Sequence, residues 1–95
     1  MILLSEVVKA VNGQLLGVNL DADIELQSIG IDSRHIVKNQ LFIAIKGEHF
    51  DGNMFASDAI KQGAAAVLVS DANTQARPAV VVKDTRLALG ALAKY

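Results

Sequence analysis

The sequence predicts a single small α/β domain with a mixed, mostly parallel sheet flanked by about three helices. Short apolar runs suited to buried strands recur at residues 41–45, 65–69 and 79–82. A stretch with helical apolar spacing lies between the first two runs, so strand, helix and strand follow one another as a parallel crossover requires. With 95 residues, of which 52% are apolar and 20% charged, the chain has the composition of one folded globular domain.

The first expected element is an amphipathic helix over residues 4–12, where apolar residues recur at helical spacing. Ser5 is expected to cap its first turn, and Gly13 is expected to end it. Residues 14–17 are expected to form a short edge strand, and residues 19–23 a polar turn.

Residues 24–31 alternate between apolar and polar side chains, but the phase of this alternation changes at Ser28. Such a change predicts a bulge, a bend or two short strands, with Gly30 inside the switch. The segment leads into a polar Asp-Ser-Arg triplet at residues 32–34, which is expected just beyond the end of a buried strand.

Residues 41–45 are apolar throughout, which predicts the central strand of the sheet, buried on both faces. A helix is expected to follow, with Asp51 or Asn53 as its cap and Gly63 at its end. The cap and the strand end enclose a loop that carries charged and hydrogen-bonding groups.

The last expected elements are strands at residues 65–69 and 79–82, separated by a polar loop that holds the single proline, and a helix opened by Asp84 and Thr85. No glycine, proline or capping residue ends this helix before Tyr95. A helix still running at that point predicts that the chain is a piece of a longer protein.

Composition argues against several classes of function. Nine basic and ten acidic residues give a net charge of −1 without a basic block, so the sequence gives no support for binding to nucleic acid or to anionic membranes. Cysteine is absent, which excludes disulfides and cysteine-ligated metals. The N-terminus lacks the basic start of a secretory signal, and no apolar run is long enough to span a bilayer, so a cytoplasmic location is expected.

The strongest candidate for a binding site is the loop at residues 46–53. It follows a predicted strand and leads into a helix, which is where α/β folds hold ligands. Lys46 supplies a positive charge, Gly47 and Gly52 permit sharp turns or close backbone approach, and the helix start presents free N–H groups. On the residues alone, a solvated turn with a helix cap remains the alternative.

The second candidate is the Asp-Ser-Arg triplet. Ser33 and Arg34 suit phosphate binding, the arginine through its bidentate fork, but the residues alone favour a surface pair between Asp32 and Arg34. Lys83 and Arg86, beside the expected helix cap, are weaker candidates for contact with a ligand.

Metal binding and catalysis have little support. His35 and His49, with Asp32 and Asp51, are metal-ligand types, but they lie in two loops without a signature spacing. The chain has no G-x-x-x-x-G-K-[ST] loop, so it lacks the apparatus for phosphoryl transfer from ATP. A binding domain is favoured over an enzyme, and a protein-interaction domain that docks through an apolar face remains open.

Four segments together resemble the N-terminal domain of the Mur ligase family. They are the Asp-Ser-Arg triplet, the Leu-Phe-Ile-Ala-Ile-Lys-Gly run from Leu41, the Phe-Asp-Gly-Asn-Met-Phe run from Phe50, and the Gly-Ala-Ala-Ala-Val-Leu-Val run from Gly63. Within the family, the Lys-Gly-Glu-His-Phe-Asp-Gly loop and the ending from Val82 look most like the ligase that adds D-alanyl-D-alanine.

The resemblance implies that residues 1–95 bind the UDP-N-acetylmuramoyl part of a substrate, in a chain whose central ATPase and C-terminal domains are its partners. The whole enzyme would use ATP and magnesium to add D-alanyl-D-alanine to the UDP-muramoyl tripeptide in peptidoglycan synthesis. This domain alone would be inactive and hold no cofactor. Ser33 stands where such ligases often carry threonine, so the related ligase that adds the third amino acid to the UDP-muramoyl dipeptide is the alternative.

The resemblance also implies which residues contact the uridine diphosphate. Ser33 and Arg34 are expected on the diphosphate side, and residues 48–50 on the uracil side. No catalytic residue and no metal ligand is expected. The complete set expected to bind UDP is Ser33, Arg34, Lys46, Gly47, Glu48, His49, Phe50, Asp51 and Gly52.

Overall fold

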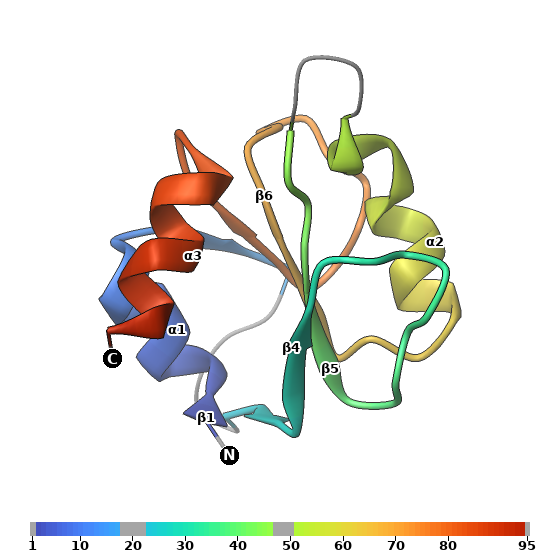
Figure 1. The fold of residues 1–95 in the computed structure, drawn as a ribbon, viewed down its shortest axis with the longest axis horizontal. Helices are drawn as coiled ribbons and strands as arrows, with labels where there is room; N and C mark the ends of the chain where they lie inside the picture. The colour runs from blue at the N-terminus through green and yellow to red at the C-terminus, as the bar shows by residue number, and fades with distance from the viewer. Residues whose placement is uncertain (1, 18–22, 47–50, 95) are drawn as a thin grey trace.

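The computed structural model describes residues 2–17, 23–46 and 51–94. Its elements in chain order are β1 (Ile2–Leu3), α1 (Leu4–Val11), β2 (Gln14–Leu16), β3 (Glu25–Leu26), β4 (Ser28–Gly30), β5 (Gln40–Ile43), the 3₁₀ turn η2 (Gly52–Phe55), α2 (Ala56–Lys61), β6 (Ala66–Val69), β7 (Ala79–Val81) and α3 (Thr85–Ala93). Figure 1 shows the sheet with helices on both of its sides.

The main sheet confirms the predicted mixed, mostly parallel arrangement. Its strand order is β2-β7-β6-β5-β4, in which β4, β5, β6 and β7 are parallel and β2 pairs antiparallel with β7 at one edge. The predicted edge strand at residues 14–17 and the crossover through α2 are therefore confirmed. The middle position, however, belongs to β6. The prediction that residues 41–45 form the central strand is wrong in this respect, because burial on both faces does not report strand order.

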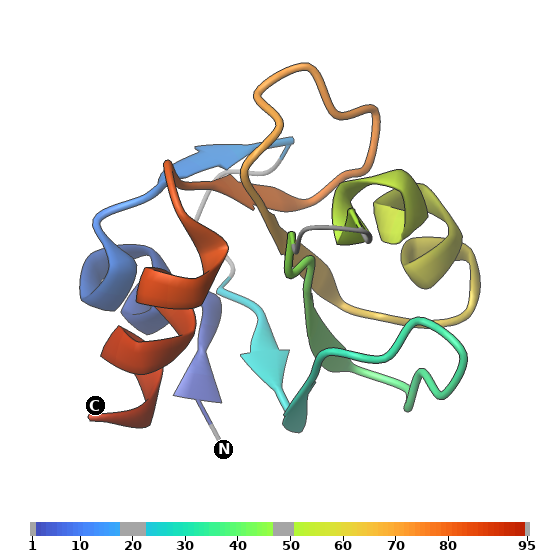
Figure 2. The ribbon, with the colours of Figure 1, turned by 45° about the horizontal axis from the view of Figure 1, so that its top comes forward.

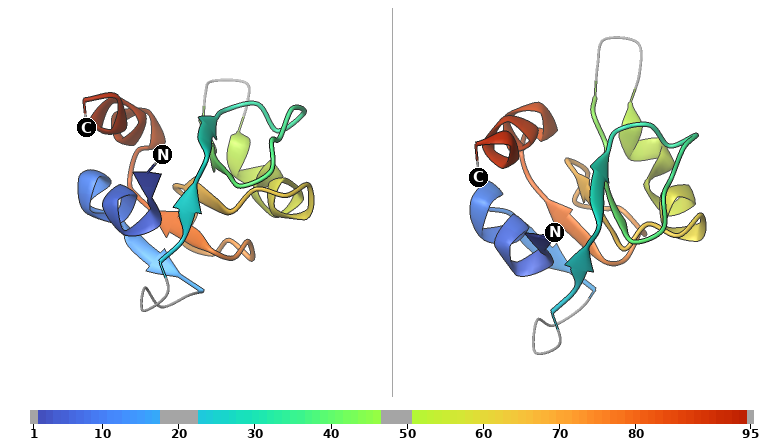
Figure 3. Two further views of the ribbon diagram at one scale, coloured as in Figure 1. Left: turned by 90° about the horizontal axis from the view of Figure 1, so that it is seen from below. Right: turned by 60° about the horizontal axis from the view of Figure 1, so that its bottom comes forward.

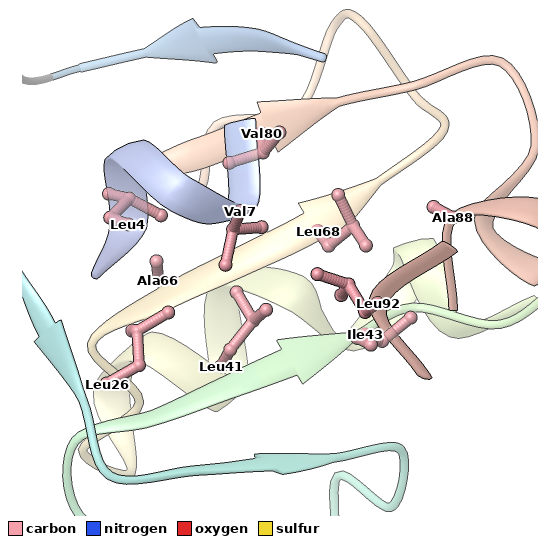
Figure 4. Packing of buried hydrophobic residues seen from close by; sticks show 10 residues of the cluster. All are labelled: Leu4, Val7, Leu26, Leu41, Ile43, Ala66, Leu68, Val80, Ala88 and Leu92. Carbon is pink, nitrogen blue, oxygen red and sulfur yellow. The ribbon is translucent and has the colours of Figure 1, made fainter. Parts of the chain in front are cut away.

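Helices cover both faces of the sheet in a three-layer arrangement. Figure 2 shows α1 and α3 together on one side and α2 on the other, and the two views of Figure 3 agree. The side chains of β5 and β6 alternate between the two layers, so each strand contributes to both cores. Figure 4 shows the larger core, in which Leu4 and Val7 of α1 and Leu92 of α3 face the sheet.

Burial of the sheet's apolar side chains is the main source of stability. Leu41, Phe42, Ile43 and Leu68 are all 0% exposed. Burying a side chain of this size contributes about 2 kcal/mol relative to leaving it in water. The two strands between the helix layers therefore form a rigid base for the loops that leave them.

The ends of α1 differ from the sequence prediction. Ser5 does not cap the helix. Its backbone N–H instead donates to Asp23 Oδ1 at 3.1 Å and its hydroxyl to Asp23 Oδ2, and this hydroxyl bond is the main cause that lowers the pKa of Asp23. At the other end Asn12, with φ of 54°, takes the left-handed position expected of Gly13. Gly13 allows close packing, because a Cβ there would lie 2.5 Å from Val80 Cγ1.

The phase change in residues 24–31 corresponds to two short strands in different sheets. β3 pairs antiparallel with β1, whereas β4 pairs parallel with β5, and Gln27 separates the two strands. This confirms one of the three predicted outcomes. Of the turn predicted at residues 19–23, residues 19–22 lie outside the described part of the chain.

Helix α3 begins as predicted but ends earlier. Asp84 Oδ1 accepts hydrogen bonds from the backbone N–H groups of Arg86 at 2.9 Å and Leu87 at 3.2 Å. The helix stops at Ala93 and Lys94 lies in a turn, so the prediction that it continues to Tyr95 is wrong. The last turn of a helix lacks partners for its carbonyl groups and is easily shortened. No helix among the described residues has the length and apolarity needed to cross a membrane.

Replacing Asp84 with alanine is expected to lower the free energy of unfolding by about 1 kcal/mol, because two N–H groups in the first turn of α3 lose their acceptor. Urea unfolding followed by circular dichroism measures this loss. Asp84→Asn keeps a side-chain oxygen in place and is the control, with an expected loss below about 0.5 kcal/mol. Equal losses in the two variants would show that the cap is not the cause.

Candidate functional site

The carboxyl ends of four parallel strands meet at one edge of the sheet. The segments that leave this edge are the triplet at residues 32–34 after β4, Lys46 after β5, Ser70 after β6, and residues 83–86 after β7. Figure 1 shows the ends of β5 and β6 at its upper side. Both candidate loops therefore leave the same edge from neighbouring strands, in the position where α/β folds bind ligands.

Backbone contacts hold the base of the loop that begins at Lys46. Lys46 and Asp51 form an antiparallel bridge, and the N–H of Gly52 donates to the carbonyl oxygen of Ile45 at 2.9 Å. A Cβ on Gly52 would lie 2.9 Å from the Cα of Ala44 and from the backbone N and O of Ile45. The close approach expected of this glycine is thus made to the chain itself. Residues 47–50, which include the other loop residues expected to bind UDP, lie outside the described part.

Asn53 joins this loop to the end of β6. Its Nδ2 donates to Asp51 Oδ1 at 2.7 Å and to Ser70 Oγ at 3.0 Å, while its Oδ1 accepts from the N–H groups of Ser70 at 3.0 Å and Asp71 at 3.3 Å. Asp51 Oδ1 also accepts from the backbone N–H of Asn53 at 3.0 Å, so Asp51 acts as a cap, but of the 3₁₀ turn η2 that leads into α2 and not of α2 itself. The hydrogen bonds from Asn53, helped by the charge of Lys46, lower the pKa of Asp51.

The triplet forms the surface pair that its residues favoured. Arg34 Nε donates to Asp32 Oδ1 at 3.1 Å, and Arg34 Nη2 donates to Asp32 Oδ2 at 3.2 Å. The carbonyl oxygen of Ser33 accepts from Gln62 Nε2 at 3.0 Å, which ties the triplet to α2. A cavity of about 630 Å³ adjoins the triplet, and Phe55 contributes an aromatic wall to it.

The Asp32 carboxyl is expected to titrate near pH 2, because hydrogen bonds from Arg34 lower its pKa from 3.8 to about 2. A lowered pKa means that the pair contributes stability above pH 3.8 and loses it as the pH falls to about 2. Carboxyl carbon chemical shifts followed by NMR measure the midpoint. In Arg34→Gln the pKa of Asp32 should return toward 3.8. An unchanged midpoint in that variant would show that Arg34 is not the cause.

A smaller cleft lies beside the first turn of α3. Arg86 Nε donates to the carbonyl oxygen of Lys46 at 3.3 Å, which connects the end of β7 with the end of β5. The cleft measures about 210 Å³. Lys83 and Arg86, weak candidates from the sequence, thus lie at the same edge as Lys46, and they line this cleft with Ser70, Asp84 and Thr85.

Metal-ligating side chains do not gather at this edge within the described residues, where no group of three His, Cys, Asp or Glu side chains could hold an ion. Of the two histidines considered, His35 belongs to these residues and His49 does not.

In three-layer α/β domains, polar loops at the carboxyl edge of a parallel sheet lie where such folds bind ligands. The model of the Mur ligase family described as its catalytic domain matches residues 25–95. The chain therefore belongs to the Mur ligase family. The matched residues contain no G-x-x-x-x-G-K-[ST] loop, although the description of that model names a catalytic domain.

Curated relatives support the same assignment. The UDP-N-acetylmuramoyl-tripeptide–D-alanyl-D-alanine ligase of Haemophilus influenzae is 45% identical over 76 residues, covering 79% of this chain and 17% of the relative. The enzyme of the same name from Escherichia coli is 44% identical over 92 residues, covering 97% and 20%. A UDP-N-acetylmuramoyl-L-alanyl-D-glutamate–2,6-diaminopimelate ligase from Aquifex aeolicus is 42% identical over 65 residues, covering 68% and 14%.

Solved structures agree with the fold. A crystal structure of MurF from Acinetobacter baumannii has a TM-score of 0.78 and 31% identity, covering 93% of this chain and 19% of that one. A MurF ligase from Thermotoga maritima in complex with ADP has a TM-score of 0.64 and 25% identity, covering 70% and 16%. The chain thus spans at most about one fifth of the length of the relatives and structures described here.

Proposed function

We propose that residues 1–95 are the UDP-substrate-binding domain of an ATP-dependent ligase that adds D-alanyl-D-alanine to the UDP-muramoyl tripeptide in cytoplasmic peptidoglycan synthesis. The observation that carries this proposal is the meeting of the Asp-Ser-Arg triplet and the loop from Lys46 at one edge of the sheet. The named activity of the relatives from Haemophilus influenzae and Escherichia coli supplies the substrate.

The remaining domains of such a ligase would do the chemistry. The matched regions make up 17% and 20% of the two curated relatives, which leaves room for a central ATPase domain and a C-terminal domain. A MurF ligase has been solved with ADP, which supports nucleotide use elsewhere in the full-length protein. ATP and magnesium would act there, while this domain holds the substrate by its nucleotide end.

A titration of the isolated chain with the UDP-muramoyl tripeptide, followed by backbone amide NMR shifts, tests the proposal. We expect saturable shifts at Ser33 and across residues 46–52. Ser33→Ala and Lys46→Gln should each weaken binding about tenfold, since each removes a hydrogen bond to a charged group. Ser57→Ala and Lys61→Gln on the exposed surface of α2 are matched controls. Shifts that appear only outside the sheet edge would refute the site.

The ligase that adds the third amino acid is the second candidate, favoured by Ser33 and by the 42% identity to the Aquifex aeolicus enzyme. Both substrates carry UDP, so binding to this domain does not separate the two. The choice of substrates by the full-length enzyme distinguishes the two candidates. Offered the UDP-muramoyl tripeptide with D-alanyl-D-alanine, or the UDP-muramoyl dipeptide with diaminopimelate, this enzyme should use only the first pair if the main proposal holds.

A further inference from the structure

The cleft beside α3 gathers positive charge from two segments that are far apart in the sequence. Lys46 follows β5, while Lys83 and Arg86 follow β7, and all three side chains line it. The single acid in its lining, Asp84, uses its carboxylate to accept two N–H groups of its own helix. Within the described residues, none of the three cations forms a salt bridge. The cleft therefore presents net positive charge at the edge of the sheet.

Thr85 adds a hydroxyl group to the lining of this cleft. Three polar residues are buried among those described, and two of them have partners: Gln40 Oε1 accepts from the N–H of Val37 at 3.3 Å, and Thr74 Oγ1 accepts from that of Ala76 at 3.2 Å. Thr85 is only 2% exposed and lines the cleft, but no described residue hydrogen-bonds to its hydroxyl. No buried side-chain oxygen or nitrogen of the described residues lacks a partner, so the Thr85 hydroxyl is accessible from the cleft, where a group that enters can hydrogen-bond to it.

The two arginines at this edge differ in availability. The fork of Arg34 is already engaged by Asp32 through Nε and Nη2. Arg86 uses only Nε, in its bond to the carbonyl oxygen of Lys46, and its terminal nitrogens have no partner within the described part of the chain. An incoming anion would have to break the bidentate pair with Asp32 to reach Arg34. Arg86, in contrast, is held in position through Nε and keeps its two terminal nitrogens as donors for a ligand.

We propose that the cleft lined by Lys46, Lys83, Thr85 and Arg86, rather than Arg34, holds the diphosphate of a nucleotide-linked substrate. This inference rests on the proposed function and revises the placement of the diphosphate at Arg34 that the family resemblance implied. Neighbouring strands lie about 4.8 Å apart, so the end of β7 is about 14 Å from the end of β4. An extended nucleoside diphosphate fits this span, with its nucleoside beside the triplet and its phosphates in the cleft.

The test compares UDP with uridine by calorimetric titration, with inorganic diphosphate as a competitor. Lys83→Gln and Arg86→Gln should each weaken UDP binding about tenfold and leave uridine binding unchanged. Lys61→Gln, an exposed cation on α2, is the matched control and should change neither. Inorganic diphosphate should compete with UDP in the wild type and no longer do so in Arg86→Gln.

Thr85→Val separates a ligand contact from a structural role. The change preserves shape but removes the hydroxyl, so UDP binding should weaken several-fold while the melting temperature stays the same or rises, since no bond within the described fold is lost. A fall in melting temperature with unchanged UDP binding would assign Thr85 to the fold and overturn its role in the cleft.

The outcomes distinguish the two proposals. If Arg34→Gln weakens UDP relative to uridine and the cleft variants do not, the diphosphate lies beside the triplet, and this inference fails while the proposed function stands. If neither UDP nor the UDP-muramoyl tripeptide shifts any amide at the sheet edge, the proposed function fails and this inference falls with it.

Discussion

Replacing Gly52 with alanine is expected to lower the free energy of unfolding by about 3 kcal/mol, the upper part of the range for overpacking a tight site. The added Cβ would lie 2.9 Å from three backbone atoms of Ala44 and Ile45, and backbone at the end of a buried strand cannot yield as a flexible side chain can. Relief would require the loop to move away from β5. Urea unfolding measures the loss, and weaker binding of the UDP-muramoyl tripeptide should accompany it.

Gly90→Ala is the matched control for this substitution. Gly90 lies in α3 at an exposed position, and a Cβ there would meet no atom within 4 Å. Alanine is a better helix former than glycine, so this variant should gain about 1 kcal/mol. The same chemical change thus has opposite expected signs at the two positions. A loss below about 1 kcal/mol in Gly52→Ala would contradict the tight packing described for the loop base.

Replacing Asn53 with alanine is expected to lower the free energy of unfolding by about 2 kcal/mol, because the amide makes four hydrogen bonds at a half-buried position. The N–H groups of Ser70 and Asp71 would lose their acceptor, and the pKa of Asp51 would rise toward its ordinary value because the side-chain donor of Asn53 is lost while its backbone N–H remains. Urea unfolding measures the first effect, and NMR titration of the Asp51 carboxyl measures the second.

Asn73→Ala is the control, since Asn73 is an exposed loop residue whose side-chain amide makes no hydrogen bond within the described residues. Its expected effect is below about 0.5 kcal/mol. If the two alanine variants lose the same free energy of unfolding, the hydrogen bonds by which Asn53 joins the ends of β5 and β6 are not the cause. If Asn53→Ala strongly lowers the free energy of unfolding but leaves the pKa of Asp51 unchanged, the loss comes from the hydrogen bonds to Ser70 and Asp71.

Local patterns predicted most of the elements. Strands β5 and β6 appear in the sequence as uninterrupted apolar runs because helices cover both of their faces. The change of phase before Ile29 marks the passage from one sheet to another, and the acids at the starts of η2 and α3 cap them. Each of these signals lies within a few residues of the feature it predicts.

Features that depend on distant partners were not predictable. The first turn of α1 finds its acceptor in Asp23, which is 18 positions from the donor Ser5. Asn53 likewise hydrogen-bonds to Ser70 across 17 positions. No spacing in the sequence links either pair. The order of the strands was not predictable for the same reason. The apolar run of β5 suits the middle position of the sheet and the position next to it equally well.

The candidate site was predicted in part. The family resemblance implied that the triplet and the loop from Lys46 contact the same ligand, and the two segments do leave the same edge, since β4 and β5 are parallel. The cleft beside α3 was largely missed, because its lining comes from residues that are 40 positions apart, such as Lys46 and Arg86. The sequence around Asp84 predicted a helix cap and gave only weak support for contact with a ligand.

The shared layer formed by α1 and α3 has a consequence for the order in which the fold can assemble. Leu4 and Val7 are synthesised well before Leu92, yet the three side chains pack in one core. Until α3 has left the ribosome, the side of β5 and β6 that carries Leu41 and Leu68 lacks the cover that Ala88 and Leu92 provide. The face covered by α2 can close earlier, because Phe42 and Ala59 lie close together in the chain. Growing chains would therefore expose one apolar side of the sheet to water for longer than the other.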